Sequence, residues 1–279
     1  MSAEIASGSV NAAMLSVVRH RRLIYELTKR DIVGRYRGSA IGLLWSFFNP
    51  LLMLVVYTFV FSVIFKSRWG ISSNESRTDF AIALFVGMIM HGIFAECVNR
   101  APTIITANVN YVKKVVFPLE VLPVTALGSA LFHAMASIAV LLIADAVLNQ
   151  RLPYTVVFLP LLLVPLSLGS LGFAWFLSAL GVYVRDIAQA TGIFTTVLMF
   201  LSPVFYPTSS LPPSFQFWIK LNPLTFIIEQ GRAILIFGVA YMLAQGFADK
   251  APWALTRRTA LYALATSVSY FALQTGVGW

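Results

Sequence analysis

Arginine and lysine residues are concentrated near the start of the chain, where they could bind an anion. Residues 19–45 contain seven of the twenty Lys and Arg residues: Arg19, Arg21, Arg22, Lys29, Arg30, Arg35 and Arg37. An arginine guanidinium presents a planar fork of N–H donors that matches two oxygens of a phosphate. Arg35 and Arg37 are therefore our candidates for binding the head group of a charged substrate. Anionic phospholipid would satisfy both equally well, so this alternative stays open.

Residue patterns typical of catalysis are scarce. The sequence contains no GxxxxGK[ST] loop and no Gly-Lys pair, so this chain cannot be its own P-loop ATPase. It has three histidines and one cysteine, Cys97, and these form no HExxH or CxxC motif. The isolated carboxylates fall on different expected helices or loops. We therefore predict no catalytic residue and no metal site.

The elements that position the arginines must lie in a membrane. Of 279 residues, 58% are hydrophobic and only 11% are charged. A soluble domain of this composition would not stay monomeric in water. A net charge of +9 is also found in nucleic-acid-binding proteins, but here the basic residues flank apolar runs and form no tract on a soluble domain. The sequence predicts an all-α integral membrane protein that contacts membrane lipids and no nucleic acid.

Residues 19–37 predict an amphipathic helix that lies in the membrane interface. One face carries Leu23, Ile24 and Leu27, whereas the opposite face carries charged residues such as Glu26 and Lys29. Basic residues just before a first span hold that end in the cytoplasm, so we expect a cytoplasmic N-terminus. We expect residues 1–18, which are small and polar, to be disordered and to contain no signal peptide.

Six apolar runs predict six membrane spans. They lie at about residues 41–65, 80–98, 121–147, 155–183, 187–205 and 259–277. The loop 101–120 carries Lys113 and Lys114 and is expected in the cytoplasm. Segment 206–237 is interrupted by prolines and charges, which predicts re-entrant or interfacial helices before the last span. Residues 19–279 would thus form one multi-pass transmembrane domain.

Polar residues within the spans predict helix contacts. Ser129, His133 and Ser137 recur every four residues, so this face of the third span must meet protein or water. Ordinary interhelical hydrogen bonding is their simplest role. Glu96 and Arg100 stand one helical turn apart, where a charged pair close to water is inexpensive. A stripe of small residues in the fourth span predicts close packing: Ser170, Ala174 and Ser178.

Five motifs in a fixed order resemble the permease subunit of type-2 ABC exporters. They are RYRGSAIGLLWSFFNPLL (35–52), NVNYVKKVVFPLEVLP (108–123), VYVRDI (182–187), SPVFYP (202–207) and NPLTFIIEQGR (222–232). Each motif alone is weak, but their ordered combination over roughly residues 15–238 is specific. Within the family, the chain looks most like the branch that exports O-antigen, other lipid-linked polysaccharides and teichoic acids.

The resemblance implies a complex in a bacterial inner (plasma) membrane. Two copies of this permease would enclose one channel, and two separate ATPase subunits would bind ATP and Mg²⁺, so this chain itself needs no cofactor. Residues 104–114 are implied to be the coupling helix that docks on the ATPase. The residues assigned to that contact are Ile104, Asn108, Asn110, Tyr111, Lys113 and Lys114. The segment after Ser202 is implied to form the outer gate.

Aromatic residues are candidates for lining and closing the channel. Their faces pack against the C–H surfaces of sugars, and their bulk closes a resting pore. The candidates for channel and gate are Trp45, Tyr57, Phe205, Tyr206 and Pro207. Core packing or an interfacial aromatic belt is the alternative role for each aromatic residue.

We therefore expect a non-catalytic transport subunit that moves a lipid-linked, O-antigen-like polysaccharide outward, a step in lipopolysaccharide biosynthesis. One alternative is a type-2 exporter of teichoic acid, drugs or simple lipids. A membrane-embedded glycan-processing enzyme is another, and it predicts catalytic carboxylates or histidines at the membrane surface. An ion channel is the last, and it predicts conductance without ATP.

Overall fold

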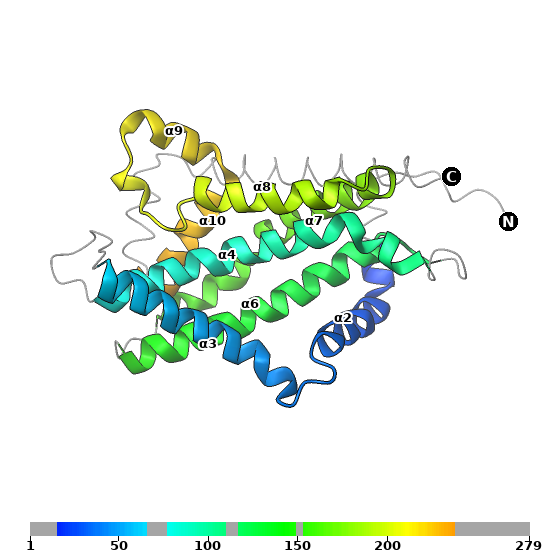
Figure 1. Ribbon diagram of the computed structural model, residues 1–279, viewed down its shortest axis with the longest axis horizontal. Coiled ribbons are helices and arrows are strands. Elements are labelled where there is room, and N and C mark those ends of the chain that lie inside the picture. The colour runs from blue at the N-terminus through cyan, green and yellow to red at the C-terminus, as the bar shows by residue number, and fades with distance from the viewer. Residues whose placement is uncertain (1–15, 66–76, 110–116, 149–152, 238–279) are drawn as a thin grey trace.

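The computed structural model describes residues 16–65, 77–109, 117–148 and 153–237, and every element within these residues is a helix. Four helices run along the long axis of the molecule (Figure 1): α4 (Arg77–Ile104), α6 (Val121–Leu148), α7 (Leu159–Tyr183) and α8 (Ile187–Leu201). The all-α prediction is confirmed for the described part of the chain. Residues 16–18, which we expected to be disordered, are helical.

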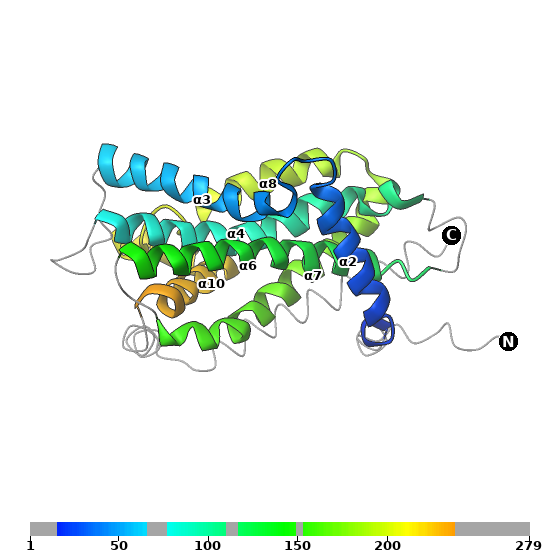
Figure 2. The same ribbon diagram turned by 90° about the horizontal axis from the view of Figure 1, so that it is seen from below.

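Helix α4 is the centre of the bundle. It packs against α6 and α7 (Figure 2), and it also contacts α8 and α10 (Pro223–Arg232). In its most apolar window 78% of the residues are buried, compared with 11% in the window of the first span, Gly42–Phe61. Leu84, Met90 and Val98 are completely buried in the core. The other helices are therefore positioned by their contacts with α4.

The amphipathic helix α2 (Arg21–Arg35) lies at one end of the bundle, beside α6. Leu23, Ile24 and Leu27 are half-buried there, and the charged face is exposed, as predicted. The chain then turns through Gly38 and Gly42, whose φ angles are +87° and +51°. A side chain at either position would be strained, so glycine permits the reversal into the first span.

The first span consists of three helical segments. They are η1 (Gly42–Leu44), α3 (Trp45–Tyr57) and the π-helical η2 (Thr58–Ile64). The π segment begins where the Thr58 hydroxyl donates a hydrogen bond to the Leu54 carbonyl at 2.7 Å. Such a bond competes with the backbone for the same acceptor, which loosens the regular α-helical pattern.

Helix α4 is longer than predicted. Our span ended at residue 98 and our loop began at residue 101, but the helix continues through Ile104 and is followed by η3 (Thr106–Asn108). Ala101, Ile104 and Ile105 are buried in the bundle. Their packing retains the helical turn even though Pro102 removes one backbone hydrogen bond within it.

Within the described residues, four helices are long and apolar enough to cross a membrane. Their spanning segments are Gly42–Phe61, Asp79–Ile104, Val121–Leu148 and Tyr154–Tyr183, the last of which begins with η4 (Tyr154–Phe158). Helix α8 is apolar but has 15 residues, about 22 Å, which is shorter than a hydrocarbon core of about 30 Å. The predicted span 259–277 lies outside the described residues. Six spans therefore remain a prediction.

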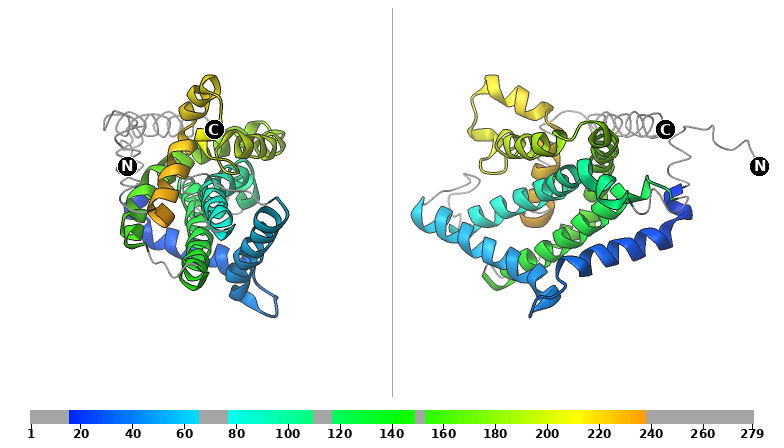
Figure 3. Two further views of the ribbon diagram at one scale, coloured as in Figure 1. Left: turned by 90° about the vertical axis from the view of Figure 1, so that its left-hand side faces the viewer. Right: turned by 45° about the vertical axis from the view of Figure 1, so that its right-hand side comes forward.

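The segment before residue 237 folds into short helices: η5 (Thr208–Ser210), α9 (Pro213–Leu221), α10 and the π-helical η6 (Ala233–Phe237). Asn222 separates α9 from α10 and caps α10 by accepting a hydrogen bond from the Leu224 N–H at 3.0 Å. Helix α9 protrudes at the end of the bundle opposite to α2 (Figure 3). We refer to these two extremities as the α2 end and the α9 end.

Candidate functional site

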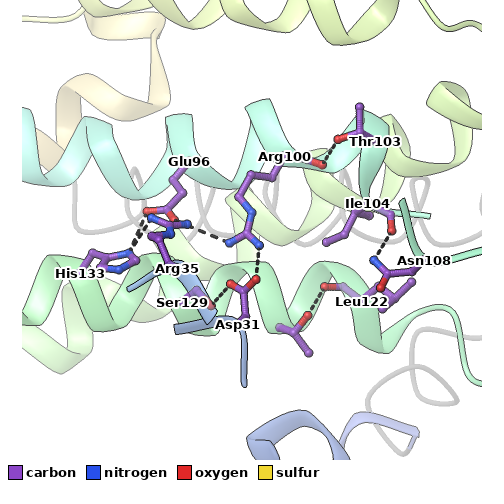
Figure 4. A network of polar contacts seen from close by, with 11 residues as sticks. Asp31, Arg35, Glu96, Arg100, Thr103, Ile104, Asn108, Leu122, Ser129 and His133 are labelled. Carbon is purple, nitrogen blue, oxygen red and sulfur yellow. Dashed lines mark hydrogen bonds and ion pairs between the residues drawn. The ribbon is translucent and has the colours of Figure 1, made fainter. Parts of the chain in front are cut away.

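Six polar residues from three helices form an ion-pair cluster near the α2 end (Figure 4). Helices α2, α4 and α6 each contribute two residues: Asp31 and Arg35, Glu96 and Arg100, Ser129 and His133. The two members from each helix are four residues apart, so each pair lies on one helical face, one turn apart. The cluster consequently has two layers, each containing one residue from every helix.

The first layer joins Arg35, Glu96 and His133. Arg35 Nη2 lies 2.6 Å from Glu96 Oε1, and its Nη1 lies 3.3 Å from His133 Nδ1. The same imidazole nitrogen is 3.4 Å from Glu96 Oε2. The Arg35 side chain is 40% exposed, whereas that of Glu96 is 21% exposed. This layer therefore attaches the end of α2 to both central helices.

The second layer joins Asp31, Arg100 and Ser129. Asp31 accepts hydrogen bonds from Arg100 Nη2 at 2.7 Å and from the Ser129 hydroxyl at 2.5 Å. Partial burial would raise the pKa of Asp31, but the hydrogen bonds from Arg100 and Ser129 and the positive charge of Arg100 outweigh burial and hold it below its ordinary value. Arg100 Nη1 also lies 3.7 Å from Glu96 Oε1, which connects the two layers.

A glycine allows α2 to approach α6 closely enough for these contacts. A Cβ atom at Gly128 would lie 2.9 Å from the side chain of Thr28, closer than two carbon atoms can normally pack. The small residue thus permits the contact between α2 and α6. It lies one position before Ser129, so the close approach and the polar contact with Asp31 occur together.

The two arginines that the sequence analysis assigned to a head group lie in different environments. Arg35 belongs to the ion-pair cluster, whereas Arg37 is exposed in the turn after α2. The Glu96 and Arg100 pair that the sequence predicted is present, as are the predicted interhelical bonds of Ser129 and His133. Sequence reasoning missed Asp31. Its spacing of four residues from Arg35 was the available signal.

A small pocket of about 200 Å³ lies between α3, α4 and α6 and borders the cluster. Its lining includes Glu96, His133 and Ser137, together with Asn49 and Tyr57 from the first span. Tyr57, a predicted channel residue, thus lines the same pocket as the carboxylate of the first layer.

Only part of the predicted ATPase contact can be located. Ile104 is buried at the end of α4, and Asn108 follows in η3, where its side-chain amide donates to the Ile104 carbonyl at 2.8 Å. Helix α4 therefore connects this contact directly to the ion-pair cluster, because Arg100 lies one turn before Ile104. The other predicted contact residues lie outside the described part of the chain: Asn110, Tyr111, Lys113 and Lys114.

The predicted gate aromatics do not all come together. Phe205 stacks on Phe200 with ring centroids 5.4 Å apart and lies 6.4 Å from the ring of Phe61, near the α9 end. Tyr206 donates a hydrogen bond to the Phe200 carbonyl at 3.0 Å, and the half-buried Pro207 follows it. Trp45 lies apart from this group at the start of α3, where it packs edge-on against Phe48.

A buried arginine holds the α9 end, and sequence reasoning assigned no role to it. Arg232 of α10 is only 2% exposed. Its Nε donates to the Ala83 carbonyl of α4, and its Nη2 donates to the Val204 carbonyl in the loop after α8, both at 2.8 Å. Gly87 makes room for this guanidinium, since a Cβ there would lie 2.8 Å from Nη2. Arg232 therefore joins three segments of the chain.

Residues 22–236, which include the ion-pair cluster and the segment around Arg232, match the family described as ABC-2 type transporter. The chain belongs to this family. The proposed resemblance to type-2 ABC exporters is thereby confirmed. The long apolar helices and the family match together make the chain a multi-pass membrane permease.

Several curated relatives of this permease are polysaccharide exporters. The O-antigen export system permease protein RfbA of Myxococcus xanthus is 27% identical over 227 residues, covering 79% of this chain and 84% of the relative. The polysialic acid transport protein KpsM of Escherichia coli is 24% identical, with coverage of 75% and 79%. The capsule polysaccharide export inner-membrane protein CtrC of Neisseria meningitidis serogroup B is 23% identical, with coverage of 78% and 80%. Like these relatives, the chain is a transport subunit and not an enzyme.

Proposed function

We propose that this permease exports a lipid-linked, O-antigen-like polysaccharide from the cytoplasmic to the outer side of a bacterial inner membrane. The observation that carries the proposal is the similarity to O-antigen and capsule polysaccharide permeases over about three quarters of the chain. An exporter of teichoic acid, drugs or simple lipids would share the fold, so the glycan is the part of the proposal that needs a direct test.

The working complex in this proposal contains two copies of the permease and two ATPase subunits that bind ATP and Mg²⁺. Each permease has six spans, of which α8 and residues 259–277 are the fifth and sixth, and its N-terminus is cytoplasmic. The exposed apolar side chains of α3 and α8, such as Phe47 and Phe194, would face lipid or the second copy of the chain. The basic residues of α2 support the orientation.

Helix α4 is the element through which ATP hydrolysis reaches the channel in this mechanism. The ATPase contact at residues 104–114 begins at the end of α4, one turn beyond Arg100. A movement of that contact shifts Arg100 relative to Asp31, and so it moves α2 against the bundle. At the far end of the same helix, Arg232 links α4 to the loop 202–207 and to α10, which form the re-entrant outer gate.

A reconstituted transport assay tests the proposed function. The permease and its partner ABC ATPase are placed in proteoliposomes, and ATP hydrolysis and translocation are measured with a lipid-linked O-antigen. A lipid-linked poly(glycerol phosphate) and a hydrophobic drug serve as matched alternatives. The proposal is supported if only the O-antigen stimulates ATP hydrolysis and is translocated. If only one of the other two compounds stimulates hydrolysis, that compound represents the substrate class instead. Ion conductance without ATP would instead favour a channel.

Cysteines introduced at Asn110 and Tyr111 in a Cys97-free background test the ATPase contact. Crosslinks to the co-purified ATPase are expected in at least one nucleotide state. Their absence in every nucleotide state would remove residues 104–114 from the interface.

A further inference from the structure

A polar pocket of about 530 Å³ opens between α2, the end of α4 and the start of α6. Three guanidinium groups line it, together with one carboxylate, one amide and one hydroxyl. These side chains are Arg30, Asp31, Arg35, Arg100, Asn108 and Thr125. Positive groups therefore outnumber the negative group in the lining, which favours an anionic ligand.

Arg35 and Arg100 retain N–H donors for such a ligand. Each guanidinium carries five N–H donors. Arg35 directs Nη2 to Glu96 and Nη1 toward His133, and Arg100 directs Nη2 to Asp31. These contacts occupy only part of each donor set. A phosphate with several acceptor oxygens could thus bridge Arg30, Arg35 and Arg100 while the ion pairs persist.

The position of the pocket indicates which class of anion would bind there. It lies beside the amphipathic helix α2, whose Leu27 lines the pocket together with Ile104 and Leu122. The amphipathic, basic sequence of α2 is typical of a helix that lies in a membrane interface. A ligand that carries a phosphate on an apolar chain would therefore match both parts of the lining.

We propose that this pocket binds the phosphate head group of a lipid through Arg30, Arg35 and Arg100. Its predicted composition differs from the pair that the sequence suggested, since Arg37 does not line the pocket and Arg30 and Arg100 do. The shared chemistry is a phosphate, which either the carrier of the transported glycan or a membrane phospholipid could supply. Only the first source rests on the proposed function.

Phosphate binding in this pocket would act on the ion-pair cluster. Arg35 and Arg100 belong to both, and their partners Glu96 and Asp31 would share them with the ligand. A bound head group would consequently weaken the attachment of α2 to α4. Occupancy of the pocket would then be sensed by the helix that begins the ATPase contact.

Direct binding to the purified permease, without ATPase, tests the proposal. The probes are farnesyl pyrophosphate, phosphatidylglycerol and farnesol, which has no phosphate, and the dissociation constants are measured by fluorescence titration in a mild uncharged detergent. The test variant is Arg30→Gln. The matched control is Arg22→Gln, which removes the same charge from an exposed position of the same helix outside the pocket. Arg100→Gln provides a second test at a lining residue on α4.

The expected result is that Arg30→Gln weakens binding of farnesyl pyrophosphate about tenfold, the usual scale for losing one charge-assisted contact. Arg22→Gln should change it less than twofold, and farnesol should bind much more weakly. Stronger binding of the pyrophosphate than of phosphatidylglycerol would assign the pocket to the carrier. Equal binding of both, with the same loss in Arg30→Gln, would support the phosphate site and assign it to the bilayer.

The phosphate-site proposal would be overturned if Arg30→Gln and Arg22→Gln changed the dissociation constant equally. It would also be overturned if farnesol bound as tightly as farnesyl pyrophosphate. Because the readout needs neither ATP nor transport, a failure of the export assay leaves it unaffected. The two proposals can therefore fail separately.

Discussion

The two ends of helix α4 hold their charges in different ways. At the α2 end, Arg35 and Arg100 pair with carboxylates on neighbouring helices, and all four side chains are partly exposed. At the α9 end, the fully buried Arg232 donates to the backbone carbonyls of Ala83 and Val204.

This difference indicates which end can rearrange. Partly hydrated side chains exchange partners at low cost, because water compensates for a lost contact. A buried guanidinium that leaves its carbonyl acceptors has no such compensation, so the penalty for breaking its contacts is several times larger. The α2 end is suited to movement, and the α9 end is suited to holding α10 and the loop after α8 on α4.

Substituting two glycines by alanine tests whether the backbones pack tightly at both ends of the bundle. These substitutions have the largest expected effects on stability. A Cβ at Gly181 of α7 would lie 2.2 Å from the Pro102 carbonyl oxygen and 2.6 Å from the Pro102 Cα. Because both atoms belong to the backbone, the helices must separate. Gly181→Ala should destabilise the permease by about 3 kcal/mol or prevent its folding, as overpacking of a core does.

Gly87→Ala tests the α9 end with the same substitution. The new methyl would meet Arg232 Nη2 at 2.8 Å and the Val204 backbone at 3.2 Å, so we expect a smaller loss, about 2 kcal/mol. Gly92→Ala is the control on the same helix, because nothing lies within 4 Å of its Cβ. Thermal unfolding can be followed by labelling of the single, buried Cys97. A Gly87→Ala protein as stable as Gly92→Ala would show that Arg232 is not tightly held.

Removal of the carboxylate shared by both layers should have the next largest effect. Glu96→Gln leaves Arg35 and Arg100 facing a neutral amide, and we expect a loss of about 2 kcal/mol after allowance for partial exposure. The double variant Arg35→Gln, Glu96→Gln should lose less than the sum of the single variants. Strict additivity in the Cys97 unfolding assay would mean that the 2.6 Å pair contributes nothing to stability.

Local spacing predicted part of the site. The four-residue intervals between Glu96 and Arg100 and between Ser129 and His133 identified two of the three faces that meet in the cluster. The amphipathic pattern located α2 correctly, because the alternation of Leu and charged residues depends only on helical periodicity.

The remaining contacts had no local signal. Asp31 and Arg100 are 69 positions apart, and Arg232 and Ala83 are 149 positions apart. The bonds from Arg232 to Ala83 and Val204 end on backbone carbonyls, which every residue possesses, so no pairing of residue types could reveal these two bonds. The extended end of α4 was missed for a related reason: the hydrophobicity breaks at residue 101, whereas tertiary packing continues the helix through Ile104.

A pH series tests the second layer of the cluster. The pKa of Asp31 lies below its ordinary value of 3.8, so its contribution to stability is complete above about pH 4 and is lost as the pH falls through the lower, folded-state pKa. Asp31→Asn should cost about 1 kcal/mol at pH 7. The difference in melting temperature between the two proteins should stay constant from pH 7 to 5 and shrink below pH 4. A difference that disappears already at pH 5 would contradict the ion pair with Arg100.

The smallest expected effect is at the α9 end, where Tyr206 donates a hydrogen bond to the Phe200 carbonyl at 3.0 Å. Partial burial raises the pKa of Tyr206, so the hydroxyl stays protonated and remains a donor at neutral pH. Tyr206→Phe keeps the ring and removes only this neutral bond, and we expect a loss of about 0.5–1 kcal/mol in the Cys97 assay. Phe205→Leu in the same loop, which instead removes the stacked ring, is the control. If Tyr206→Phe cost more than Asp31→Asn, this neutral bond would contribute more to stability than the ion pair of the second layer, and the contrast between an ion-paired α2 end and an α9 end anchored by Arg232 would be lost.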